Sequence, residues 1–263
     1  MINTERQEKK MSEKNIIYKY KAINNFTIDS LKNRYHYFSK PSQLNDPFDC
    51  RILLDKGLEK YSYELKTEIE RTADCWRILS LTSDEKNKKM WGLYADSYKG
   101  ICIGYKYYQT TDAKQILINR NDDLAKIKEC YDEKQFYGIL TEIDYKSEKY
   151  RFKGEHDAEK AIKNSIQKKD RIWEDEKECR VILPLFDGDK TKLPYLNSFE
   201  LKLEYDVSEF AEIIFGYEVP LKKVLEIKEI IDSNYKTKVD FYVIQPNYIS
   251  NILEKRKLIN IYI

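Results

Sequence analysis

Histidine, glycine and proline are scarce in this chain, which has 2 His, 8 Gly and 6 Pro among 263 residues. With only two histidines, a zinc site built on imidazole ligands is not expected. The low glycine and proline content, together with a charged fraction of 35%, argues against a disordered chain and against an array of turns. The sequence therefore predicts a folded protein rather than a disordered segment or a turn-rich repeat.

Paired cysteines and long apolar runs are also absent. The 5 cysteines lie far apart, and none of them forms a Cys-x-x-Cys pair. Such spacing is typical of reduced thiols in a cytoplasmic protein. No apolar run approaches the roughly 20 residues that cross a bilayer, and the charged first residues lack the apolar segment of a signal peptide. We therefore expect a cytoplasmic protein without a membrane partner, with a flexible arm at residues 1–14 and a single domain at residues 15–263.

No strong excess of one charge is present, because 47 Lys and Arg nearly balance 45 Asp and Glu and leave a net charge of +2. This balance gives no general attraction to nucleic acid or to an anionic membrane. The glycine motifs of P-loop, dinucleotide-binding and serine-hydrolase sites are missing as well. A functional site in this chain must therefore be built from other residues.

Strand and helix patterns are interspersed along the chain. Ile16–Tyr20 and Gly100–Tyr105 have the composition of strands, and Leu221–Asn234 has the apolar periodicity of a helix. Many of the expected strands follow one another too closely for a helical crossover between parallel strands. The sequence therefore predicts an α+β fold with interspersed helices around a mixed, largely antiparallel central sheet.

Segments rich in polar and aromatic residues stand out from this background. They place Tyr, Trp, Asn, Asp and Glu where a packed core alone would use Leu or Val. In chain order they are Tyr18-Lys19-Tyr20-Lys21, Tyr35-His36-Tyr37-Phe38-Ser39-Lys40-Pro41 followed by Asn45-Asp46-Pro47-Phe48-Asp49, Met90-Trp91-Gly92-Leu93-Tyr94-Ala95 with Gly100, and Trp173 with Glu176-Lys177-Glu178-Cys179-Arg180. We expect the functional site among them.

The segment that begins at Glu176 has the pattern of a strand with charged side chains on one face. If Glu176–Val181 is a strand, then Glu176, Glu178 and Arg180 project to the same side. Two close carboxylates can raise the pKa of one of them, as general acid or base catalysis requires, and Arg180 can offset their repulsion. A solvated sheet face with a ladder of salt bridges would have the same spacing.

The segments nearer the start of the chain also allow a functional and a structural interpretation. Asn45–Asp49 is either a ligand-binding loop or a capped turn that places Phe48 in the core. In Tyr18–Lys21 the tyrosines share one strand face and the lysines share the other. Either pair can reach a site, and the structural alternative buries the tyrosines and exposes the lysines.

The tryptophan-containing segment predicts an aromatic face on a helix. Trp91, Tyr94 and Tyr98 follow the spacing i, i+3 and i+7 within and just beyond an expected helix at Asp84–Asp96. Such a stripe packs in the core or forms a platform on which a flat ring stacks. Both interpretations remain open on the spacing alone.

As an ordered set, these segments resemble a widespread bacterial family that is catalogued as a domain of unknown function. The resemblance extends from about Ile16 to about Phe215 and also includes Ile213-Ile214-Phe215-Gly216. Two positions depart from the usual pattern, which has Arg at the position of Lys21 and His near the position of Tyr98. The lysine keeps the positive charge but lacks the bidentate fork of arginine, and the tyrosine removes an acid, base or ribose-binding group.

The order of the segments is in turn similar to ADP-ribosyltransferase-like folds, which have a Tyr/Arg-bearing first strand, an aromatic-Ser second strand and a late Glu-x-Glu strand. The resemblance implies an enzyme that uses NAD as its substrate and moves ADP-ribose to an acceptor. A late glutamate would stabilise the positive charge that develops on the ribose as nicotinamide leaves. An effector role in phage defence or as a toxin, with an antitoxin or defence-system partner, is implied on the same ground.

The resemblance also assigns roles to residues. The catalytic group would be Glu176, Glu178 and Arg180, with one glutamate at the ribose and the other orienting the acceptor or the ribose. Residues that would bind NAD are Tyr20, Lys21, Phe38, Ser39, Asn45, Asp46, Phe48, Asp49, Trp91 and Tyr94. No metal site is part of this assignment.

Two other classes of function stay open on the residues alone. A metal-dependent nuclease would use Asp46, Asp49, Asp175 or Glu176, and Lys177. A non-catalytic module would bind a nucleotide or a partner protein through the same polar side chains. The arrangement of the carboxylates separates the first two classes, because convergence on one point favours a metal, whereas a glutamate beside an aromatic slot favours NAD.

Overall fold

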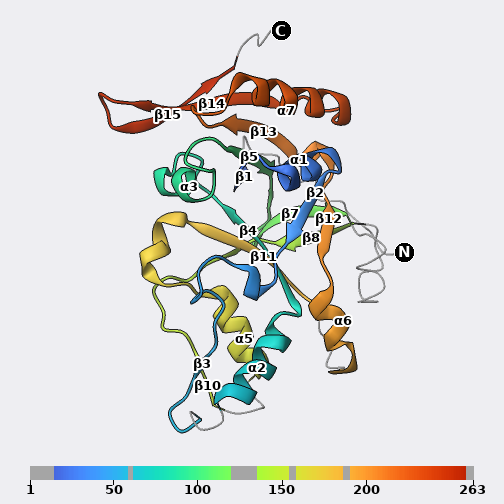
Figure 1. Ribbon diagram of the computed structural model, residues 1–263, viewed down its shortest axis with the longest axis vertical. Helices are drawn as coiled ribbons and strands as arrows, with labels where there is room; N and C mark the ends of the chain where they lie inside the picture. Colours follow the sequence, from blue (N-terminus) through green and yellow to red (C-terminus); the bar gives the residue numbers. More distant parts are fainter. Residues whose placement is uncertain (1–14, 59–61, 120–134, 154–157, 186–189, 259–263) are drawn as a thin grey trace.

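An eight-stranded sheet forms the centre of the computed structural model, which describes residues 15–58, 62–119, 135–153, 158–185 and 190–258 (Figure 1). Its strand order is β15-β14-β13-β5-β1-β4-β11-β9. The strands are β1 (Ile16–Lys21), β4 (Trp76–Thr82), β5 (Ile101–Lys106), β9 (Thr141–Glu142), β11 (Glu178–Pro184), β13 (Phe210–Phe215), β14 (Asp240–Asn247) and β15 (Ile252–Lys257). Neighbouring strands are antiparallel except β13 and β14, so the expected α+β fold with a mixed, largely antiparallel sheet is confirmed. The arm expected at residues 1–14 lies outside the described residues.

Helix α7 (Leu221–Asn234) makes the parallel pairing of β13 and β14 possible. It lies between these strands in the chain, as a crossover between parallel strands requires. Val224, Ile227 and Ile231 of α7 are buried in the main core cluster, and Figure 1 shows the helix alongside β13 and β14. The helix predicted at these residues is therefore confirmed with the same bounds.

Smaller sheets and further helices surround the central sheet. The small sheets are β2 (Tyr35–Phe38) with β12 (Leu201–Glu204), β3 (Leu53–Leu54) with β10 (Arg151–Phe152), and β6 (Tyr108–Gln109) with β7 (Lys114–Asn119) and β8 (Gln135–Ile139). The other α-helices are α1 (Asn25–Lys32), α2 (Ser62–Ala73), α3 (Lys88–Leu93), α5 (Ala158–Gln167) and α6 (Leu193–Ser198). Short 3₁₀ helices are η1 (Pro41–Gln43), η4 (Arg171–Glu176), η5 (Lys190–Lys192) and η6 (Val207–Glu209).

Strand β1 has different surroundings on its two faces. Tyr18 and Tyr20 are buried on one face, where the Tyr20 ring meets the Trp91 ring edge-on with centroids 5.1 Å apart. On the other face Ile17 belongs to the main core cluster, and Lys19 and Lys21 are half-buried. The alternation of side chains along a strand produces this separation. The tyrosines therefore pack in the core as one alternative expected, but the lysines do not point into open solvent.

Helix α3 is shorter than the helix expected at Asp84–Asp96. It begins after Asn87, whose side chain accepts a hydrogen bond from the Met90 N–H, and it ends at Leu93. Residues 96–98 then have left-handed φ angles between 48° and 69°, which take the chain off the helical path. The Tyr98 ring therefore stacks on Trp91 at 5.9 Å from outside the helix, and the prediction of one helical aromatic face is wrong.

The cysteines in the described part of the chain are free thiols, and all of them are buried: Cys50, Cys75, Cys102 and Cys179. Within the described residues, no helix combines the length and the apolar character that a membrane crossing requires.

Candidate functional site

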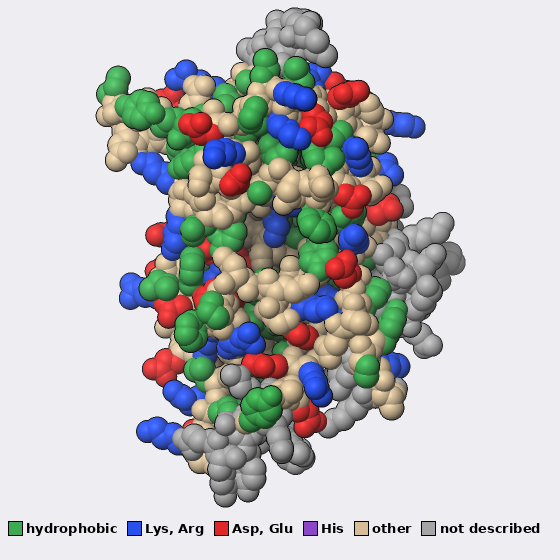
Figure 2. Space-filling view, in the orientation of Figure 1, with side chains coloured by type: hydrophobic (Ala, Val, Ile, Leu, Met, Phe, Trp, Pro, Cys, Tyr) green, Lys and Arg blue, Asp and Glu red, His purple; other side chains and the backbone are tan. Residues whose placement is uncertain are grey.

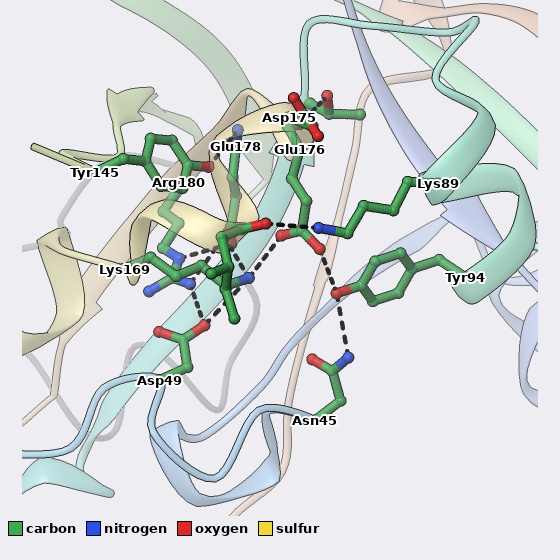
Figure 3. Close-up of polar contacts among 12 residues, drawn as sticks. Asn45, Asp49, Lys89, Tyr94, Tyr145, Lys169, Asp175, Glu176, Glu178 and Arg180 are labelled. Atoms are coloured by element: carbon green, nitrogen blue, oxygen red, sulfur yellow. Dashed lines mark hydrogen bonds and ion pairs between the residues drawn. The ribbon is translucent and has the colours of Figure 1, made fainter.

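Charged side chains from three parts of the chain meet in a buried cluster (Figure 3). They are Asp49 from the loop after η1, Lys169 from the link between α5 and η4, Glu176 from the end of η4, and Glu178 and Arg180 from β11. The cluster brings together the three residues that the sequence analysis assigned to catalysis. It also adds Lys169, for which the sequence gave no expectation.

Arg180 holds Glu178 in a two-point ion pair. Its Nε donates to Glu178 Oε1 at 2.7 Å and its Nη2 donates to Glu178 Oε2 at 2.9 Å. The Nη2 group also donates to Asp49 Oδ2 at 2.6 Å, and Nη1 donates to the Ile166 carbonyl at 2.7 Å. Burial raises the pKa of the Glu178 carboxyl, but the charge and hydrogen bonds of Arg180, together with Lys169, outweigh burial and lower it to about 2. Glu178 is therefore ionised and fixed in place.

Glu176 is held by different partners, and no guanidinium of the described residues is among them. Its Oε2 accepts from Lys169 Nζ at 2.6 Å, and its Oε1 accepts from the Tyr94 hydroxyl at 2.8 Å. The Tyr94 oxygen in turn accepts from Asn45 Nδ2 at 3.1 Å. A chain of hydrogen bonds therefore runs from the Asn45 loop through Tyr94, which directly follows α3, to the carboxylate. Figure 3 shows Tyr94 pointing from its helix toward Glu176.

Glu176–Val181, the range for which a shared strand face was considered, is not a strand over its full length, because β11 begins at Glu178. Glu176 closes the 3₁₀ helix η4, and Lys177 has a left-handed φ of 46° that turns the chain into β11. Strand alternation therefore does not explain why both carboxylates face the same point. They meet because the turn at Lys177 returns Glu176 to the side of β11 on which Glu178 lies, where Lys169 contacts both.

Lys169 lies at the centre of the three carboxylates. Its Nζ is 2.6 Å from Glu176, 3.3 Å from Glu178 and 3.5 Å from Asp49. Burial lowers the pKa of this ammonium, but the three carboxylates together raise it above its ordinary value. On its other side the ammonium lies 5.2 Å from the ring centroid of Trp173. No motif includes Lys169, so the sequence could not have identified it.

Two adjoining pockets open beside the cluster. The smaller has a volume of about 230 Å³, and Glu176, Tyr94 and Asn45 are in its lining. The larger has a volume of about 510 Å³ and is lined by residues from β1, α1, β2 and β12. Lys19, Ser39 and Gln43 line both pockets, so the two adjoin, and we refer to them together as the cleft. The face drawn in Figure 2 is hollowed near its middle, with positive and negative side chains interspersed around the hollow.

Two lysines of β1 line this cleft. Lys19 Nζ donates to the Ser80 carbonyl at 2.7 Å, and Lys21 Nζ donates to Ser30 Oγ at 2.9 Å. Burial lowers the pKa of Lys19 to about 8 despite the attraction of Glu178. Burial, with repulsion from Lys19, lowers the pKa of Lys21 to about 7. Both amines therefore change their protonation state near neutral pH.

The residues expected to bind NAD fall into three groups. Those in the lining of the cleft are Tyr20, Lys21, Ser39, Asn45, Asp49 and Tyr94. Phe38 and Trp91 are 1% and 0% exposed and belong to core clusters, away from the lining. Asp46 and Phe48 lie on the loop outside the lining. Phe48 is 74% exposed, so the alternative that placed its ring in the core is wrong. Asp46 accepts a hydrogen bond from the Phe48 N–H at 2.9 Å, as in the capped turn that was one of the two alternatives for this segment.

The carboxylates do converge on one point, but an ammonium fills it. Asp49, Glu176 and Glu178 surround Lys169 Nζ, the position that a divalent cation would take in a nuclease. In the part of the chain that the structure describes, no group of three or more His, Cys, Asp or Glu side chains is arranged to hold a metal ion. The donor set therefore fits a metal only if Lys169 leaves.

Comparison with known proteins gives a match to one family model over part of the chain. A model of a protein family of unknown function, DUF2971, matches residues 90–181. The match begins at Met90 in α3 and ends at Val181 in β11, so it includes Tyr94, Lys169 and the two glutamates of the cluster. No curated protein and no solved structure matched the chain.

Proposed function

We propose that this protein cleaves NAD and transfers ADP-ribose to an acceptor, with Glu176 as the catalytic carboxylate. The observation that carries the proposal is the position of Glu176, which is 2% exposed and yet lines the smaller pocket together with the Tyr94 ring. Asp49 and Glu178 line the same pocket, so the choice of Glu176 depends on its hydrogen-bond partners as well as on its place beside Tyr94. A fixed carboxylate beside an aromatic side chain is the arrangement that the proposed NAD cleavage uses. The resemblance of the segment order to ADP-ribosyltransferase-like folds supports the same activity.

The reaction breaks the bond between nicotinamide and its ribose. The bonding electron pair leaves with nicotinamide, and positive charge develops on the ribose. A fixed carboxylate next to that ribose lowers the barrier because it acts where the charge appears. A hydroxyl or other nucleophile of the acceptor then forms the new bond to the ribose and releases its proton to solvent.

The different partners of the two glutamates assign them different roles. Both oxygens of Glu178 are occupied by Arg180, which is itself completely buried. Glu176 is bound by Tyr94 and Lys169, two groups that can keep its charge while one of its oxygens turns toward a substrate. We assign Glu178 and Arg180 to the frame of the site and Glu176 to the chemistry.

The dimensions of the cleft fit a substrate that extends beyond one ring. Ligand pockets typically have volumes of about 300–1,000 Å³. The smaller pocket, of about 230 Å³, accommodates the nicotinamide end next to Tyr94 and Met90. The larger pocket, reached past Lys19, then receives the remainder of the molecule.

The biological setting is part of the same proposal. NAD and reduced thiols coexist in the cytoplasm, and the free cysteines of the described residues suit that compartment. We place the protein there as an effector of phage defence or as a toxin, which modifies a macromolecule and is controlled by an antitoxin or a defence-system partner.

Incubation of the purified protein with labelled NAD and cell lysate tests the activity. We expect release of nicotinamide and transfer of label, and both should fall about a hundredfold or more in Glu176→Gln, which keeps the shape of the side chain and removes its charge. Asp175→Asn is the matched control, because this exposed neighbour undergoes the same change of charge.

Other results would identify the other classes of function. Cleavage of DNA or RNA that EDTA abolishes, without any response to NAD, would establish a nuclease. An increase in Tm with NAD but no release of nicotinamide in lysate would establish a binding module. Equal release by wild type and Glu176→Gln would overturn the role of Glu176.

A further inference from the structure

The larger pocket lies at the end of the cleft away from Glu176. Its floor includes Lys19 and Lys21 of β1, and its walls come from the first turn of α1 and from β2. Lys202 and Glu200 complete the charged groups in its lining, and both are exposed. Basic side chains therefore outnumber acidic ones in the lining, and the two half-buried charged residues, Lys19 and Lys21, are both basic.

Neither Lys19 nor Lys21 has a carboxylate within ion-pair distance among the described residues. Their ammonium groups bond instead to the Ser80 carbonyl and to the Ser30 hydroxyl. Desolvating an ammonium without a counter-charge is unfavourable, and the lowered pKa values of both amines are the result. Attraction by Glu178 offsets part of this cost at Lys19. Burial and the charges of Lys21 and Lys19 lower the pKa of His36 to about 3, so this neighbouring imidazole stays neutral and adds no further positive charge.

Helix α1 strengthens the preference of the pocket for an anion. Asn24, Phe26 and Thr27 at its N-terminal end line the same pocket. The aligned peptide dipoles place partial positive charge at that end of the helix. A phosphate group in the pocket would thus meet two ammonium groups and a helix N-terminus together.

Aromatic side chains line the pocket beyond the lysines. Tyr35 is fixed by a hydrogen bond from its hydroxyl to Asp29 at 2.6 Å, and Tyr37 bonds through its hydroxyl to Gln43 at 3.1 Å. Phe26 is 79% exposed although it lines the pocket, so its ring is available to a bound molecule. Planar ring systems stack on such faces.

We infer that the larger pocket binds the nucleoside diphosphate part of a ligand, with the phosphates on Lys19 and Lys21 and the base against Phe26 and the β2 tyrosines. The inference deepens the proposed function, and it rests on that proposal only in assuming that one ligand occupies both pockets. It stands on the charge and shape of the pocket, so binding does not depend on the chemistry at Glu176.

Titration calorimetry with ADP tests the inference, because ADP carries the base and the diphosphate but no nicotinamide bond to cleave. We expect ADP to bind wild type and Glu176→Gln with equal affinity. Lys21→Met should weaken binding at least tenfold, and Lys21→Arg should restore most of it. Lys32→Met, an exposed lysine of α1 outside the lining, is the matched control and should bind as wild type does.

The outcomes separate the inference from the proposed function. ADP binding that depends on Lys21, without any release of nicotinamide from NAD, would retain the inference and reject the catalytic proposal. Release of nicotinamide by a protein that does not bind ADP, or that binds it equally well in Lys21→Met, would overturn the inference and retain the catalysis. A Tm for each variant within a few degrees of wild type shows that binding is compared between folded proteins.

Discussion

Lys169 and Glu176 form an ion pair of 2.6 Å in which both side chains are at most 4% exposed. The pair belongs to a cluster of three carboxylates and two cations, so the cluster keeps a net negative charge in the interior. A buried pair of this kind is weak evidence of stability by itself, because desolvation offsets much of the attraction. Removing one charged member of the cluster does destabilise the fold, because it leaves a remaining buried charge without its counter-charge.

Lys169→Met should destabilise the fold by about 3–5 kcal/mol, because three buried carboxylates would then share Arg180 alone. Urea denaturation of wild type and variant measures the difference. Lys163→Met on the exposed face of α5 is the control, and it should change stability by less than about 0.5 kcal/mol. A variant at Lys169 as stable as this control would show that the cluster is solvated.

The stability of the protein should fall in acid with a contribution from Glu178. The folded-state pKa of this carboxyl is about 2, below the ordinary value of a glutamate. The unfolded chain therefore binds more protons as the pH falls, and the stabilisation present above about pH 4.5 is lost progressively toward pH 2. Denaturation between pH 6 and pH 2 should give a shallower decline for Glu178→Gln than for wild type. Parallel declines would exclude Glu178 as a source of the acid sensitivity.

Lys21 should make the stability depend on pH in the same direction, but in a higher pH range. Its folded-state pKa is lowered to about 7, so between pH 7 and its ordinary value the unfolded chain binds the additional proton. Stability should therefore rise with pH over this range. Denaturation between pH 7 and pH 9.5 checks this, and Lys21→Met should remove the part of the rise that Lys21 contributes. An unchanged slope in this variant would place Lys21 in solvent.

Gly216→Ala should destabilise the protein by about 1–3 kcal/mol or more, because there is no room for a methyl group. A Cβ atom at Gly216 would approach the Tyr98 carbonyl at 1.9 Å, where backbone cannot give way. Gly92→Ala in α3 is the matched control, since nothing lies within 4 Å of its added Cβ. It should be neutral or stabilising by up to about 1 kcal/mol. The midpoints of urea denaturation compare the two, and a tolerated Gly216→Ala would show that the Tyr98 loop is not held against β13.

The sequence predicts best what depends on local pattern. Alternation in β1 and the period of α7 predicted both elements, because their burial follows from the spacing of side chains. The short α3 could not be predicted, since the left-handed residues after it carry ordinary side chains and their strain is supported by tertiary contacts.

The site was partly predictable for a similar reason. Glu178 and Arg180 meet through strand alternation, which the sequence displays. Glu176 reaches them through the left-handed turn at Lys177, and Lys169 lies in the link after α5. Neither the turn at Lys177 nor the position of Lys169 has a signal in the sequence. Phe38 was assigned to the site by resemblance, but the structure places it in the main core cluster.

The two pockets share Lys19, Ser39 and Gln43 while most of their linings are separate. Two small fragments, one beside Tyr94 and one beside Tyr35, can therefore occupy the cleft at the same time without excluding each other. A linker that passes over Lys19 would convert the second binding event into an intramolecular one, with a large gain in affinity from effective concentration. The cleft is accordingly suited to the construction of a bivalent inhibitor from weak parts.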